Sequence, residues 1–282
     1  IVYEAATADI GDINMIDPFH LQKYDISAVN YNRDIENFPI LKSILERIGT
    51  NIYKSPTDMA ISKTKDGILD DSVIVEAAKQ EVIRRYFRYK KENLLGIIEK
   101  DVVDRTEKLM LKLGVDESYR KVVLAARDCA EQGYNQGKGY KSLFCGTAIE
   151  IDDGKKIITG KNSPLLHSES AAVINSLKHL ALVPDNIHLI PEDIIQRIRK
   201  MKRNVGGSVN PSLDVSEMLI ALSVSIGNNS YSGRCIEKIP LLNGCEIHTT
   251  HIPNIGDEEG IRNLKMNLTT DALSSQRIYL RT

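Results

Sequence analysis

The residues best suited to chemistry lie near the start of the chain, where polar side chains gather on loop-like segments. Asp17 lies close to His20, and Asn32, Arg33 and Asp34 are consecutive. A guanidinium can clamp an anion, while a carboxylate or an imidazole can carry a proton. We therefore predict that Asp17, His20 and Asp34 are catalytic and that Asn32 and Arg33 bind substrate. The alternative is a structural ion pair of Arg33 with Asp34 or Asp17.

A second loop-like segment, Ser55-Pro56-Thr57-Asp58, follows the one clear helix of the first stretch, in which apolar residues recur at helical spacing between Ile40 and Ile48. We predict that Thr57 and Asp58 add to the same substrate site. The sequence predicts no metal ligand among these residues.

The segment His167-Ser168-Glu169 is an H-x-E pair, which zinc deaminases use to bind the metal and to move protons. That chemistry needs two further ligands, and no P-C-x-x-C follows. Cys235 and Cys245 are too far apart in sequence for one helical turn to present both. A deaminase-like shape without zinc is therefore favoured over a working zinc enzyme.

Two other segments look like sites and fail on their spacing. Gly154 to Lys161 suggests a phosphate loop, but its glycines are one residue too far apart and Asn162 replaces the hydroxyl residue that holds Mg²⁺. Cys245, His248 and His251 could offer three metal ligands, but an extended strand would point His248 away from the other two.

Composition excludes several classes of protein. The 282 residues are 42% hydrophobic and 27% charged with a net charge of −1, which predicts a folded chain without a global attraction for nucleic acid or anionic membrane. The basic residues from Arg197 to Arg203 are explained by a helix C-terminus, where cations complement the helix dipole.

The sequence predicts a cytoplasmic protein. Its four cysteines are scattered, which predicts buried, reduced thiols, and it shows neither a membrane span nor a signal peptide. Because residue 1 is Ile rather than Met, we expect further sequence upstream.

The apolar pattern predicts a mixed α/β fold in three parts. Residues 1–70 are expected to mix loops and helix, residues 71–140 to form a helical connector that includes stops at Gly114 and Gly133, and residues 141–282 to form a C-terminal α/β domain. The last domain should open with a hairpin that turns at residues 152–155. Helices are expected at about 169–182, 191–202, 215–226 and 232–242, with Asp214 and Glu217 in a capping box, and strands at about 187–190, at 246–251 and after Leu268.

Several segments form a recognisable pattern: Tyr3–Asp9, Asn14–Leu21, Val29–Glu36 and Ser55–Met59, with looser likeness at Thr159–Ser163, Ala171–Asn175, Asn210–Pro211 and His248–Thr250. In these segments the chain resembles the bacterial family catalogued as domain of unknown function 1846. The resemblance implies a C-terminal portion that lacks an N-terminal half with a phosphate-loop-like segment. The first part would then complete a nucleotide-binding-type α/β domain. His167 and Glu169 stand where the family leads us to expect a turn, which suggests that the H-x-E is incidental.

Three functions stay open on this basis. The first is a nucleotide-dependent enzyme of the phosphoryl-transfer type, which would use a magnesium nucleotide in the intact protein. The second is a ligand-binding or assembly protein that forms a homo-oligomer. The third is a zinc-dependent, deaminase-like hydrolase with a cytidine-deaminase-like layout of the C-terminal domain, using His167 and Glu169 or His248 and His251. The expected partner is a small molecule or nucleotide, and neither nucleic acid nor a membrane.

Overall fold

The computed structural model describes residues 71–139, 143–152, 154–206 and 211–273. The chain divides into two compact units, Ile1–Arg120 and Lys121–Thr282. The expected mixed α/β class is confirmed, because helices accompany a four-stranded mixed sheet. The three-part division at residues 70 and 140 stays a prediction.

The described part of the first unit is helical. A long helix and a shorter one pack together, and the Tyr86 hydroxyl of the first donates to Glu107 of the second at 3.0 Å. Gly114 ends the second helix in the left-handed conformation, as predicted, and its N–H bonds the carbonyls of Met110 and Leu111. The elements are α4 (Asp71–Leu94), α5 (Lys100–Leu113) and the short η2 (Glu117–Tyr119).

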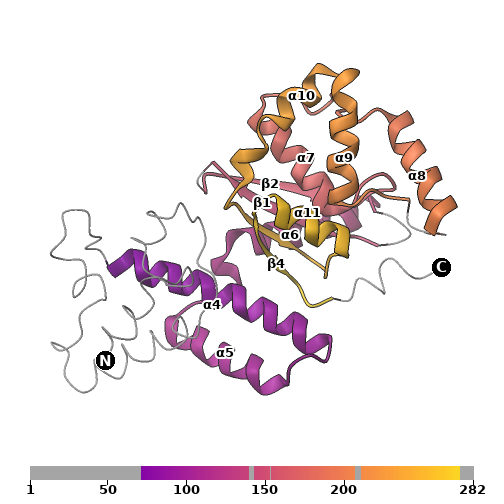
Figure 1. Cartoon of the computed structure of the whole chain (residues 1–282). Coiled ribbons are helices and arrows are strands. Elements are labelled where there is room, and N and C mark those ends of the chain that lie inside the picture. The colour runs from indigo at the N-terminus through magenta and orange to yellow at the C-terminus, as the bar shows by residue number, and fades with distance from the viewer. Residues whose placement is uncertain (1–70, 140–142, 153, 207–210, 274–282) are drawn as a thin grey trace, which may run out of the picture. The chain divides into compact units, whose positions relative to one another are not determined.

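The second unit is built around a sheet of strand order β2-β1-β3-β4 (Figure 1). The first strand runs antiparallel to both neighbours, whereas the third and fourth are parallel. The predicted hairpin and the predicted strands near 246 and after 268 are confirmed. The strands are β1 (Gly146–Ile151), β2 (Lys156–Lys161), β3 (Glu246–Thr249) and β4 (Asn267–Thr270).

Helices cover both faces of this sheet. On one face, Val122 and Ala126 of the helix Lys121–Asn135 pack against Ala148. On the other face, Ile149 and Ile247 belong to the larger hydrophobic core of the unit. The alternation follows from the period of two along a strand. The helices are α6 (Lys121–Asn135), α7 (Ser168–Leu180), α8 (Glu192–Gly206), α9 (Val215–Val224), α10 (Ser230–Ile236) and α11 (Ile255–Asn263), with short turns η3 (Ser225–Gly227) and η4 (Ile239–Leu242).

Three local predictions were wrong. Gly133 lies inside α6 rather than after it. The expected strand at 187–190 is absent, because the Leu189 carbonyl accepts from the Ser232 hydroxyl instead of from a strand. The expected helix 232–242 breaks before Pro240, whose ring cannot occupy a helix interior. The sequence also missed α11.

The capping box is confirmed: Asp214 accepts from the Glu217 N–H at 2.9 Å, and Glu217 accepts from the Asp214 N–H at 3.1 Å. Cys129, Cys145 and Cys235 are buried and form no disulfide, and Cys245 is half-buried. Among the described helices, none is long and apolar enough to cross a membrane.

Candidate functional site

The site predicted near the start of the chain lies outside the described residues. This holds for each member of it: Asp17, His20, Asn32, Arg33, Asp34, Thr57 and Asp58. Their roles as catalytic and substrate-binding residues stay a prediction.

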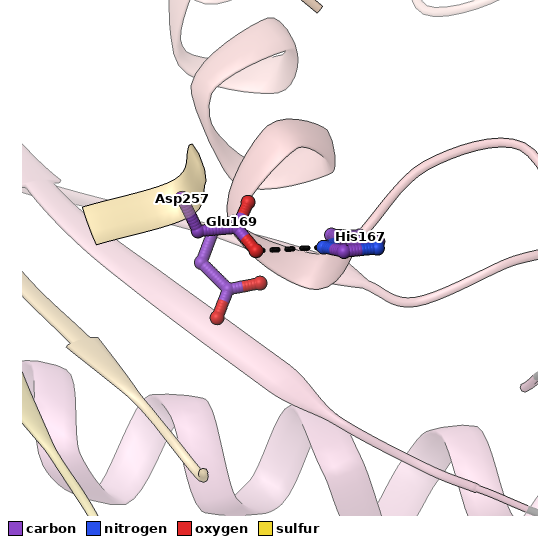
Figure 2. Close-up of side chains that lie close together, drawn as sticks. All are labelled: His167, Glu169 and Asp257. Atoms are coloured by element: carbon purple, nitrogen blue, oxygen red, sulfur yellow. Dashed lines mark hydrogen bonds and ion pairs between the residues drawn. The ribbon is translucent and has the colours of Figure 1, made fainter. Parts of the chain in front are cut away.

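The structure instead brings together titratable side chains at the start of two helices (Figure 2). His167 is the N-cap of α7 and Glu169 lies in its first turn, while Asp257 lies in the first turn of α11. One ligand atom from each of the three lies within 4.8 Å of the others. The two helices follow β2 and β3, so the fold joins residues that are ninety positions apart in sequence.

His167 and Asp257 form the closest contact of this group. The His167 Nδ1 atom lies 2.6 Å from Asp257 Oδ2, and the other oxygen of Asp257 accepts from the Val215 N–H at 2.9 Å. His167 is 1% exposed and Asp257 is 0% exposed. The carboxylate is therefore fixed on one side by the start of α9 and on the other by the imidazole.

Glu169 is held by hydroxyl groups and by a second histidine. Ser168 donates to Oε2 at 2.9 Å and Thr249 donates to Oε1 at 2.8 Å, while His251 Nε2 lies 3.3 Å from Oε1. The Thr147 hydroxyl lies within 3.1 Å of both hydroxyls that hold the carboxylate. All five of these side chains are completely buried, and protein side chains hold both oxygens of the Glu169 carboxylate.

The charges in this group shift one another's pKa values. Burial works to lower the pKa of His167, but the charge and hydrogen bond of Asp257, with Glu169, raise it above its ordinary value. Burial and the Glu169 charge raise the pKa of Asp257 to about 7, although His167 opposes this. His167 and Asp257 therefore keep one proton between them near neutral pH.

The second carboxylate behaves in the opposite way. Burial works to raise the pKa of Glu169, but the charges of His251 and His167 and the bond from Thr249 bring it below its ordinary value. Burial lowers the pKa of His251. Glu169 is therefore ionised near neutral pH.

The structure separates the histidines near the third strand, as the sequence predicted. His251 lies beside Glu169, while His248 contacts Thr269 on β4, with Nδ1 2.9 Å from its hydroxyl. His248 Nε2 also lies 3.5 Å from Asp271, which forms an ion pair with Arg127 of α6. Burial works to raise the pKa of Asp271, but the bonds to His248 and Arg127 hold it well below its usual range.

The candidate phosphate loop is part of the hairpin. Gly154 occupies the turn with φ 81°, and Gly160 lies within β2 against α7. The rejection of a phosphate loop from the spacing agrees with this geometry. Sequence reasoning missed Asp257, because the deaminase pattern that begins with H-x-E continues with cysteines and not with a carboxylate.

Comparison with known proteins identifies the family. Residues 1–114 match the description "Domain of unknown function DUF1846, N-terminal", and residues 118–279 match "Domain of unknown function DUF1846, C-terminal". A UPF0371 protein of Clostridium botulinum (strain Eklund 17B / Type B) is 41% identical over 273 residues, which are 96% of this chain and 54% of the relative. A UPF0371 protein of Clostridium tetani (strain Massachusetts / E88) is 41% identical over 276 residues, with the same coverage.

These matches confirm the expected bacterial family and correct one part of the expectation. The chain spans about half the length of the curated relatives it matches. It is not a C-terminal portion only, because its first 114 residues match the N-terminal description.

Proposed function

Because the chain belongs to the DUF1846 family, whose description names no reaction, we propose from the site itself that the second unit is a cation-assisted hydrolase with a deaminase-like layout. His167 and Asp257 would hold one divalent cation, and Glu169 would move protons. The observation that carries this proposal is the convergence of His167 Nδ1 and Asp257 Oδ2 to 2.6 Å, with a Glu169 oxygen in the same group of ligand atoms.

The order of elements supports the proposal. An antiparallel hairpin leads to His167-x-Glu169 at the start of α7, and β3 leads to Pro253-Asn254-x-x-Asp257 at the start of α11. Zinc deaminases carry H-x-E followed by P-C-x-x-C, with the histidine and the cysteines on the metal and the glutamate handling protons. Asn254 and Asp257 occupy the two cysteine positions of that spacing.

The donor set fits a cation after a small movement. An imidazole nitrogen and a carboxylate oxygen are both good ligands, each at about 2.0–2.2 Å from zinc. Two adjacent ligands on one cation are then about 3.0–3.4 Å apart, since the angle between them is about 90–109°. The distance of 2.6 Å between His167 and Asp257 is that of a hydrogen bond, so the proton between them would have to leave and the atoms separate by about 0.5 Å.

The residues then divide the work of hydrolysis. A bound divalent cation supplies Lewis acidity and favours the deprotonated form of water. Glu169, ionised and oriented by Ser168 and Thr249, takes a proton from the attacking water and later gives it to the leaving nitrogen. The substrate class is a compound with an amino group on a carbon that is double-bonded to nitrogen, which becomes a carbonyl as ammonia leaves.

A substrate can reach the site only after a movement of the protein, because His167, Glu169 and Asp257 are at most 1% exposed. The segment at the start of α9 is bonded to two of them: the Val215 N–H donates to Asp257, and the His167 N–H donates to the Leu213 carbonyl at 3.0 Å. Displacement of this segment would therefore expose His167 and Asp257.

The test is a comparison of two histidines of the same helix in the full chain. Equilibrium dialysis against Zn²⁺ or Mn²⁺ should give one bound cation per chain, lost in His167→Ala and kept in His179→Ala, whose side chain is 41% exposed and pairs with Asp152. Ammonia release from aminopyrimidines and aminopurines should fall at least about 100-fold in Glu169→Gln. A chain that binds neither cation, or binds it equally without His167, would refute the proposal.

The nucleotide-dependent reaction expected from Arg33 and its neighbours stays a prediction, as do the homo-oligomer and the cytoplasmic location. Calorimetric titration of the full chain with a magnesium nucleotide, with Arg33→Ala as the control, tests the first of these. Binding that is unchanged by that substitution would remove it.

A further inference from the structure

The ligand atoms at the site are nitrogen and oxygen, and this decides which cation fits. The inference rests on the proposed function and names the class of cation. His167 offers an imidazole nitrogen, while Asp257 and Glu169 offer carboxylate oxygens. Carboxylate oxygens suit hard cations such as Mn²⁺ and Mg²⁺, imidazole suits Zn²⁺ and Fe²⁺, and thiolates select softer ions.

The thiols of the chain lie elsewhere. Cys129 donates to the Gly160 carbonyl at 3.5 Å, and Cys245 donates to the Leu241 carbonyl at 3.4 Å. Within the described ranges, the group of ligand atoms around His167 includes no cysteine. The softness that holds zinc tightly in a site with two cysteines is therefore missing here.

Asp257, which stands at the second cysteine position of the deaminase spacing, offers one of its oxygens as a ligand. Asp257 uses Oδ1 to accept from the Val215 N–H and directs Oδ2 toward His167. A backbone donor on one oxygen keeps the carboxylate from binding a cation through both oxygens, and it fixes the orientation of the oxygen that faces His167. These two residues thus offer one imidazole nitrogen and one monodentate carboxylate oxygen.

Asn254, which stands at the first cysteine position of the deaminase spacing, caps helix α11. The Asn254 side-chain oxygen accepts from the Asp257 N–H at 2.7 Å, which makes it the N-cap of α11. Asn254 therefore orients Asp257 and is occupied by the backbone. Three positively polarised helix starts, of α7, α9 and α11, surround the carboxylates and balance part of their charge.

We propose that this site takes a hard or borderline cation of the Mn²⁺ or Fe²⁺ type, in place of the thiolate-held zinc of the deaminases that share its spacing. The remaining ligands of the cation are waters, which must enter with it because His167, Glu169 and Asp257 are at most 1% exposed. Zinc binds such a site as well, as it binds most nitrogen and oxygen ligands more tightly than manganese. The distinguishing quantity is the ratio of zinc to manganese affinity, which an oxygen ligand keeps small.

The experiment introduces a thiol at position 257. In the full chain, Asp257→Cys should raise the ratio of zinc to manganese affinity by roughly 100-fold, because a thiolate favours the softer ion. Addition of Co²⁺ should give the charge-transfer absorption of a cobalt–thiolate bond in this variant and none in the wild type. Glu258→Cys is the matched control: it adds a thiol at the next position of α11, where the side chain is 37% exposed, and should leave the ratio unchanged.

The outcomes separate the two proposals. Wild-type chain that binds neither Mn²⁺ nor Zn²⁺ overturns the proposed function and this inference together. Zinc bound with an affinity ratio that Asp257→Cys leaves unchanged overturns the inference alone, since cation binding persists. Water-proton relaxation with Mn²⁺ on the wild type covers the case in which the variant does not fold. Relaxation enhanced by bound manganese with retained waters is expected, and no enhancement would overturn the inference.

Discussion

Removal of the Asp257 carboxylate should destabilise the second unit strongly even without any cation. In Asp257→Ala, His167 loses a hydrogen bond of 2.6 Å and the Val215 N–H loses its acceptor at 2.9 Å. A hydrogen bond to a charged group contributes about 1.5–3 kcal/mol, and an unsatisfied buried donor costs about 1–3 kcal/mol. The free energy of unfolding should therefore fall by about 3–5 kcal/mol, as is usual when one partner of a buried pair is removed.

Asp257→Asn separates the two contributions. The amide oxygen can still accept from the Val215 N–H, and the amide nitrogen can donate to an unprotonated His167 Nδ1. This variant should lose about 0–1.5 kcal/mol, because each contact keeps a partner and only the charge is lost. A loss as large as that of Asp257→Ala would show that the ionised carboxylate itself is required.

Hydrogen exchange of the full chain in the presence of a chelator measures this directly. Peptides from α7 and α11 report the opening free energy of the second unit without a contribution from the first. Asp193→Ala is the control, because its side chain is 60% exposed and pairs with Arg197 at 3.4 Å; it should cost less than about 0.5 kcal/mol. A loss below about 1 kcal/mol in Asp257→Ala would refute the view that this pair is a tightly held element of the fold.

Three further changes test the surroundings of the site. Gly160→Ala should lower the melting temperature sharply, because a Cβ there would lie 2.1 Å from the Ala172 nitrogen, whereas Gly227→Ala meets nothing within 4 Å and should be nearly neutral. Asp214→Ala removes the cap of α9 and should cost about 1 kcal/mol in urea unfolding, with most of this recovered in Asp214→Ser. The contribution of Asp271, whose pKa is depressed in the folded state, should be full above its unfolded value of about 3.9 and fade as the pH falls further. Asp271→Asn should therefore be destabilising in urea at neutral pH and lose that effect in acid; an equal effect at both would contradict the assignment.

Local patterns predicted much of the second unit. The hairpin was found from two strand-like runs with a turn at residues 152–155, and the start of α9 was found from the spacing of Asp214 and Glu217. In contrast, α11 was missed because glycine stands at two of its positions and few of its residues are apolar. Gly260 is required by packing, since a Cβ there would lie 2.5 Å from Val215. That contact between distant segments cannot be seen in the helix's own sequence.

The candidate site shows the same limit. His167 and Glu169 are neighbours in sequence, so their type and spacing were visible as an H-x-E pair. Asp257 joins them only because the strand order places the starts of α7 and α11 together. The deaminase pattern has cysteines at that spacing, so it does not lead to a carboxylate that can do related work. The interpretation of the H-x-E as incidental comes from the family resemblance, which predicts a turn at these residues.

The central claim, that His167 and Asp257 hold a divalent cation, is tested most directly by anomalous diffraction from crystals of the full chain soaked in Mn²⁺. The account predicts one anomalous peak about 2.0–2.3 Å from both His167 Nδ1 and Asp257 Oδ2. The two atoms should then have moved apart from 2.6 Å to about 3 Å, with Glu169 facing the waters that remain on the cation. A site without a peak, in which His167 and Asp257 stay 2.6 Å apart, would contradict the account and leave the pair a structural hydrogen bond.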